Sequence, residues 1–139
     1  PQVYHDAMAR LKRKIDGARE HLPAPVIREE EKKDLGVIFY GSMENSIVEI
    51  DDMLEESGLS VSTCRIRALP LHSDVEDFVR RHDRTIVLEI NRDGQLFGII
   101  RKEFPAELIP KIHSVSYSDG MPPRARVYSD MILEVLEDL

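Results

Sequence analysis

From Gly36 to the C-terminus, short apolar runs alternate with amphipathic segments, and this alternation limits the folds that the chain can adopt. Residues 37–40 form a continuously apolar run, which is typical of a strand covered on both faces. Strand-like segments over residues 60–67, 85–90 and 112–117 predict three further strands, each preceded by a helical pattern. Four strands alternating with helices favour an α/β fold, with a mostly parallel sheet between two layers of helices.

The apolar spacing also predicts which side of each helix faces the core. After the first strand, Ser42 is the predicted N-cap of a helix whose acidic residues, Asp51 among them, face solvent. The predicted core stripe of this helix is Met43, Ile47, Ile50 and Leu54. In the last helix, the predicted stripe is Val127, Met131, Val135 and Leu139. Ser73 and Glu76 have capping-box spacing, which predicts an N-cap at Ser73.

Residues 1–35 follow a different pattern and are predicted to be an N-terminal amphipathic helix and linker, with the α/β domain over residues 36–139. One apolar seam, at spacings of four and three, comprises Tyr4, Met8, Leu11, Ile15, Ala18 and Leu22. Pro23 and Pro25 end the helix. The seam predicts packing on this domain or on a neighbouring one. Residues 1–35 carry a net charge of +1 and the remainder −8.

Composition excludes several classes of protein. The net charge of −7 argues against nucleic acid or an anionic membrane as a partner, and no apolar run is long enough to span a bilayer. The only cysteine, Cys64, cannot form an internal disulfide, which fits a cytoplasmic location. The chain begins with Pro1, so we expect either a removed initiator methionine or a piece of a longer protein.

From its sequence motifs, no residue of the chain is expected to be catalytic, cofactor-binding or metal-binding. The chain lacks the G-x-G-x-x-G and Walker A sequences, and its five histidines are scattered singly. Cys64 lies mid-strand and is expected to be a buried apolar side chain. Gly41 and Ser42 follow the first strand, where a strand-to-helix turn can either bind an anion or serve only as a turn.

The most distinctive segment is Glu89 to Gln95, directly after the third predicted strand. Glu89 can accept hydrogen bonds from the free N–H groups at the start of the next helix. Asn91 can cap that helix, Gly94 allows close backbone approach, and Gln95 can bond to a neighbouring loop. The segment is interpreted either as a self-satisfied turn or as an interface or ligand site.

This segment also resembles the E-x-N-x-x-G-Q stretch in the alpha subunit of 2-oxoacid:ferredoxin (or flavodoxin) oxidoreductases. Other pieces match the same subunit in order: the N-terminal helix with residues 22–27, the strand and turn at 36–42, R-x-L-P-L at 67–71 and D-G-x-P at 119–122. The likeness covers almost all of the chain. Residues 124–126 depart from it, since a Ser or Thr cap is expected near there.

The resemblance implies a transketolase C-terminal-like fold, a three-layer α/β/α sandwich with five strands, one of them antiparallel. The fifth strand is then expected near residues 26–28. In this family the whole enzyme decarboxylates a 2-oxoacid on thiamine diphosphate with Mg, forms an acyl-CoA, and passes electrons through iron–sulfur clusters to ferredoxin or flavodoxin. These cofactors belong to other domains and to the beta and gamma subunits, and this chain lacks the cysteines of a cluster.

The resemblance therefore implies a noncatalytic C-terminal domain that organises domain and subunit packing and is inactive when isolated. Its motif and interface candidates are Gly41, Ser42, Glu89, Asn91, Gly94 and Gln95. One alternative is a stand-alone α/β module that binds a small anion or nucleotide through the same residues. Another is the C-terminal domain of a different thiamine-diphosphate enzyme of the transketolase type, against which the E-x-N-x-x-G-Q and R-x-L-P-L stretches argue.

Overall fold

The computed structural model describes residues 1–32 and 34–138, and within them the strands form one sheet in the order β1-β3-β2-β4-β5. The strands are β1 (Val26–Arg28), β2 (Leu35–Tyr40), β3 (Val61–Ile66), β4 (Arg84–Glu89) and β5 (Ile112–Ser116). Neighbouring strands from β3 to β5 run parallel, whereas β1 pairs antiparallel with β3. The four strands predicted from apolar runs are confirmed. The fifth strand, implied by the family resemblance, is confirmed as the antiparallel edge strand.

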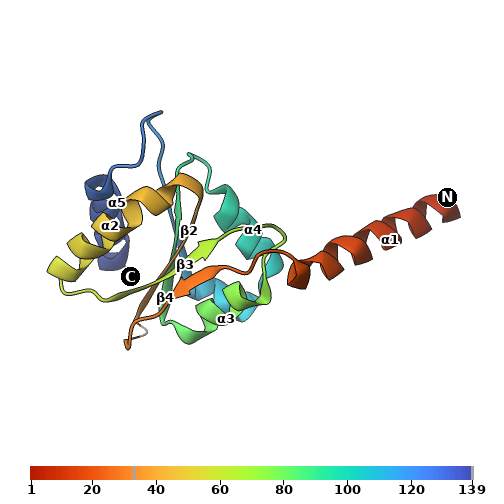
Figure 1. Cartoon of the computed structure of the whole chain (residues 1–139), viewed down its shortest axis with the longest axis horizontal. Helices are drawn as coiled ribbons and strands as arrows, with labels where there is room; N and C mark the ends of the chain where they lie inside the picture. The colour runs from red at the N-terminus through yellow and green to blue at the C-terminus, as the bar shows by residue number, and fades with distance from the viewer. Residues whose placement is uncertain (33, 139) are drawn as a thin grey trace.

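Helices cover both faces of this sheet, as Figure 1 shows. The α-helices are α1 (Gln2–Ala18), α2 (Glu44–Glu56), α3 (Ser73–Arg81), α4 (Gln95–Glu103) and α5 (Ala125–Glu137). Short 3₁₀ helices are η1 (Arg19–His21), η2 (Gly41–Met43) and η3 (Ala106–Lys111). Helices α2 and α5 pack on one face, and α3 and α4 pack on the other. The predicted three-layer α/β/α sandwich is therefore confirmed.

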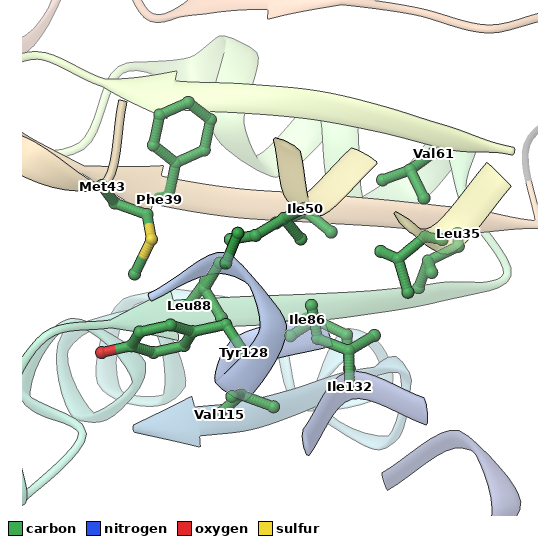
Figure 2. Packing of buried hydrophobic residues seen from close by; sticks show 13 residues of the cluster. Leu35, Phe39, Met43, Ile50, Val61, Ile86, Leu88, Val115, Tyr128 and Ile132 are labelled. Atoms are coloured by element: carbon green, nitrogen blue, oxygen red, sulfur yellow. The ribbon is translucent and has the colours of Figure 1, made fainter. Parts of the chain in front are cut away.

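The sheet has a separate apolar core on each face. Alternate residues of β2 (Leu35, Val37 and Phe39) point toward α2 and α5. Figure 2 shows Leu35 and Phe39 with side chains of β4 and both helices. Ile38 points to the opposite face and packs with Cys64 of β3 and the α3 side chains. A strand buried on both sides needs apolar residues at every position, which explains the uninterrupted run over residues 37–39, whereas Tyr40 at the end of the strand is exposed.

The order of the strands places a topological switch between β2 and β4. The chain passes from β2 through α2 to β3 on one side, and then crosses back through α3 to β4 on the other. In parallel sheets, ligands bind beyond the carboxyl ends of the strands at such a point. The candidate residues after β2 and β4 therefore lie at the position where a ligand site is expected in this fold.

Two of the predicted helix faces require correction. Asp51 is buried rather than solvent-facing, because Arg28 on β1 lies against it and forms an ion pair with its carboxylate. Burial raises the pKa of Asp51, and Arg28 opposes this rise. In α5 the predicted stripe is out of phase: the buried residues are the apolar Ala125, Tyr128 and Ile132, together with Ser129.

The residues of the predicted α5 stripe lie beside the core rather than in it. Val127, Met131 and Val135 are only partly buried. Leu139 lies outside the described residues. Both apolar series recur at helical spacing, so the contacts with the sheet and α2 decided between them.

Two predicted helix caps are also different in the structure. Ser42 lies within η2, and α2 begins after Met43 without a side-chain cap. The N-cap of α3 is His72 rather than Ser73, and its Nδ1 accepts a hydrogen bond from the Asp74 N–H at 3.3 Å. In each case the observed N-cap lies one residue away from the predicted cap, as is common for helix boundaries read from sequence.

Helix α1 stands apart from the rest of the molecule and projects away from the sandwich, with the N-terminus at its far end (Figure 1). None of its residues, all in the described part of the chain, is buried. An ion pair between Arg19 and Glu103 at 3.1 Å joins the following η1 to α4. No helix in the described residues combines the length and apolar character needed to cross a bilayer.

Candidate functional site

The six candidate residues lie together at the carboxyl ends of two adjacent strands. Gly41 and Ser42 form the start of η2 directly after β2. Glu89 is the last residue of β4, and Gln95 is the first residue of α4. Sequence reasoning therefore found residues from two separate loops that the parallel sheet places at one edge.

Glu89 is fully buried, and its carboxylate is used internally. Its Oε1 accepts from the Leu96 N–H at 2.7 Å, and its Oε2 accepts from the Phe97 N–H at 3.0 Å. The Asn91 side chain donates a third hydrogen bond to Oε1 at 2.9 Å. The Leu96 and Phe97 N–H groups belong to the first turn of α4 and have no acceptor within the helix. The dipole of α4 also favours an anion at this end. The carboxylate of Glu89 thus occupies the position that a bound anion would take.

Asn91 connects the ends of β2 and β4. Its Nδ2 also donates to the Tyr40 hydroxyl at 3.2 Å. Its Oδ1 accepts from the Asp93 N–H at 3.0 Å and from the Gln95 N–H at 3.4 Å, so it serves the turn and the start of α4. The crevice at the topological switch is therefore bridged by side chains of the protein itself.

Gly94 holds the turn in a conformation that other residues adopt at a cost. Its φ is +60°, and it is buried against β5. A Cβ at this position would lie 3.1 Å from Ser114 Oγ and 3.7 Å from Glu89 Oε2. The absence of a side chain lets the turn pack on β5 and on the Glu89 carboxylate at the same time.

An open cleft of about 510 Å³ lies beside this network, between the ends of β2 and β3 and the first turn of α4. Its walls are mainly apolar, from Tyr40, Leu69 and Ile99, and it is bordered by Arg67 and Gln95. Leu69 is half-exposed and precedes a cis peptide bond to Pro70. Sequence reasoning did not select Tyr40 or Ile99, although an aromatic hydroxyl at the end of an apolar strand was a usable signal.

The described residues do not fit the cofactors that the family resemblance implies for the whole enzyme. A diphosphate at the start of α4 would compete with the Glu89 carboxylate for the same N–H groups. Cys64 is buried in β3, and burial raises the pKa of its thiol to about 12, so it is a poor source of thiolate for a cluster. Within residues 1–32 and 34–138, no three His, Cys, Asp or Glu side chains are grouped to hold a metal ion.

The hydrogen bonds at this sheet edge stabilise the turn between β4 and α4. The buried carboxylate of Glu89 accepts three of them, two from N–H groups of α4 and one from the Asn91 side chain. Gly41, Ser42 and Gln95 are exposed at this edge of the sheet, and so is Arg67. The inner residues Glu89, Asn91 and Gly94 hold that surface in place.

Sequence comparisons give no relative for this chain: no protein-family model matches it, and no curated protein matches it in sequence. Solved structures do match in fold. A 2-oxoglutarate:ferredoxin oxidoreductase from Magnetococcus marinus, with 2-oxoglutarate, coenzyme A and succinyl-CoA bound, aligns with 96% of this chain at a TM-score of 0.77 and 22% identity. This chain spans 23% of the length of that protein chain.

Two further structures have the same fold. The alpha chain of a probable 2-oxoacid ferredoxin oxidoreductase from Thermoplasma acidophilum aligns with 82% of this chain, and with 97% of its own length, at a TM-score of 0.51 and 19% identity. A split-gene transketolase, described as an inactive beta4 tetramer, aligns with 78% of this chain and 40% of its own at a TM-score of 0.56 and 18% identity. These structural neighbours include oxidoreductases of the family that the sequence motifs resemble, and they show that this chain has a transketolase-like fold.

Proposed function

We propose that this chain is the C-terminal domain of the alpha subunit of a thiamine-diphosphate-dependent 2-oxoacid:ferredoxin oxidoreductase, in which it organises domain and subunit packing without taking part in catalysis. The observation that carries the proposal is the alignment of 96% of the chain with 23% of a 2-oxoglutarate:ferredoxin oxidoreductase. The ordered motifs at residues 36–42, 67–71 and 89–95 support the same family.

The noncatalytic role rests on the geometry at the sheet edge. In the whole enzyme, thiamine diphosphate supplies the electron sink for decarboxylation of the 2-oxoacid. Glu89 instead satisfies the first turn of α4, and Asn91 ties that turn to Tyr40 on the neighbouring strand. These residues stabilise a surface, and Gly41, Ser42 and Gln95 are the exposed parts that contact a neighbouring domain.

In this proposal, the cofactors and the electron acceptor belong to other parts of the enzyme. Thiamine diphosphate, Mg and iron–sulfur clusters are held by other domains and by the beta and gamma subunits, and ferredoxin or flavodoxin accepts the electrons. The enzyme is cytoplasmic. The isolated chain is inactive with every 2-oxoacid.

The experiment is an activity assay on the native assembly. An antibody raised against this chain is used to precipitate the protein from an anaerobic native lysate, and viologen dye reduction is measured with a panel of 2-oxoacids, coenzyme A and thiamine diphosphate. We expect 2-oxoacid-dependent reduction in the precipitate, and none with antibody pre-absorbed on the pure chain. A lysate that keeps this activity while the precipitate lacks it would contradict the family assignment. Turnover by the pure chain would contradict the noncatalytic role.

A second candidate function is a small-anion or nucleotide-binding module, and the cleft beside Gly41 favours it because Arg67 lies at its border. Calorimetric titration of the chain with coenzyme A, nucleotides and phosphate tests this candidate. Heat of binding that Arg67→Gln removes would support the module. Absence of heat, with no change in melting temperature, would exclude it for these ligands.

A further inference from the structure

Helix α1 has an apolar seam that the rest of the chain leaves uncovered. Four of its seam residues are 43–65% exposed: Tyr4, Met8, Leu11 and Ile15. The helix has 17 residues, and none in this described segment is buried. Isolated helices of this length are marginal in water, so a stable α1 needs an apolar surface against its seam.

The spacing of the seam indicates what kind of surface that is. Within α1, successive seam residues are separated by four, three, four and three positions from Tyr4 to Ala18. This average of 3.5 is the heptad spacing by which one helix packs along another. Helix α5 differs in packing broadly over the sheet and α2, with Ala125, Tyr128 and Ile132 in the core. The seam of α1 is therefore shaped for one long helix.

The charged residues that border the seam indicate which charges a partner helix should carry. Lys14 borders one side, and Arg10 lies one turn before it on that side. In the described part of the chain neither forms an ion pair, whereas Lys12 on the other side pairs with Asp16 at 2.7 Å. Two α1 helices from two copies would bring lysines together along their seams, which is unfavourable. A helix with carboxylates along its border would neutralise Lys14 and Arg10.

We propose that α1 packs along a helix of another protein domain, one whose apolar heptad seam is bordered by Asp and Glu, and that it does not pair with a second copy of itself. This inference rests on the exposure, spacing and charge of α1 and does not depend on the proposed enzyme family. It accounts for a helix that projects from the sandwich (Figure 1) and whose apolar side chains are exposed.

Two synthetic peptides test the proposal with the full chain. Both carry the same Leu and Ile heptad seam, one with Glu and the other with Lys at the positions that border it. In a fluorescence anisotropy titration, we expect the Glu peptide to bind about tenfold or more tightly than the Lys peptide, with an affinity that falls as salt is raised. Lys14→Glu should reduce this preference for the Glu peptide.

Matched variants locate the binding on the seam. Met8→Ala should weaken binding of the Glu peptide by about tenfold. Met121→Ala changes the same residue type at an exposed position of the loop before α5, and it should leave binding unchanged. Thermal unfolding of each variant verifies that the sandwich is intact.

Three results would overturn the proposal. The first is equal affinity for the two peptides. The second is failure of the Glu peptide to bind at millimolar concentration. The third is self-association of the chain in sedimentation equilibrium that Leu11→Ala abolishes, because it would identify a second copy as the partner of the seam.

Discussion

Helices α1 and α2 have similar apolar stripes in sequence, but the stripe of α2 is buried and the stripe of α1 is exposed. Ile50 and Leu54 of α2 are fully buried between the sheet and α5, whereas Leu11 and Ile15 of α1 remain about half-exposed. Both helices satisfy the same periodicity. An amphipathic pattern therefore predicts which face of a helix is covered and does not identify the surface that covers it.

The connections of the two helices to the sheet explain the difference. Helix α2 joins two adjacent parallel strands, β2 and β3, so its path back across the sheet forces its apolar side onto the sandwich. Helix α1 is followed by a connection through Pro23 and Pro25 to the edge strand β1. The Arg19–Glu103 ion pair holds the end of this segment near α4 and leaves the seam free of the sheet.

The largest expected effect comes from one substitution made in both helices. Ile50→Ala should lower the free energy of unfolding by about 2–5 kcal/mol, because it leaves a cavity in a fully packed core. Ile15→Ala should change the unfolding of the sandwich by less than about 0.5 kcal/mol. Urea denaturation followed by circular dichroism measures both. An equal loss from Ile15→Ala would mean that α1 packs on the sandwich in solution.

Carboxylates give the next largest contrast. Glu89→Gln should cost about 1–3 kcal/mol, because an amide NH₂ would meet N–H groups that now donate to a buried carboxylate. Asp16→Asn removes the exposed pair with Lys12 and should cost less than about 0.5 kcal/mol. Both are measured by the same denaturation. Unchanged stability of Glu89→Gln would show that the hydrogen bonds of Glu89 contribute little, and would shift its role toward a partner.

Glycine substitutions should have opposite signs in the two regions. Gly94→Ala should destabilise the sandwich by about 1–2 kcal/mol, because φ is +60° and the added Cβ meets Ser114 Oγ at 3.1 Å. At Gly17 on α1, an added Cβ meets nothing within 4 Å. Gly17→Ala should therefore stabilise α1 by about 0.5–1 kcal/mol and raise the helical circular dichroism signal. A stable Gly94→Ala variant would contradict the close packing of the turn.

The smallest effect is a pH dependence confined to the sandwich. Burial, and then the charge of Arg84, lower the pKa of His113 on β5 below its ordinary value of 6.5. Below pH 6.5 the unfolded chain takes up a proton more readily than the folded one, so the free energy of unfolding should fall as the pH falls through this range. Denaturation at several pH values should show a shallower fall in His113→Gln and in Arg84→Gln. A slope unchanged in both variants would exclude this contribution.

The sequence determined the parts of this protein that follow from contacts along the chain. An uninterrupted apolar run located β2, because a strand covered on both faces has no polar side to present. The segment from Glu89 to Gln95 could also be interpreted locally, since the carboxylate and the N–H groups that it accepts from lie within eight residues of one another. The edge strand β1 was predicted from the family motifs, because a strand of three residues is too short to show a periodic pattern.

Only the tertiary structure decided features that depend on a partner distant in sequence. Arg28 buried Asp51 from 23 residues away, against the helical pattern that placed this side chain in solvent. Contacts with the sheet and α2 selected the Tyr128 and Ile132 side of α5 over an equally periodic alternative. The cleft beside Tyr40 and the exposure of the α1 seam likewise arise from how elements meet in space. Periodicity along the chain encodes the faces of helices and strands, whereas burial depends on which faces come together in three dimensions.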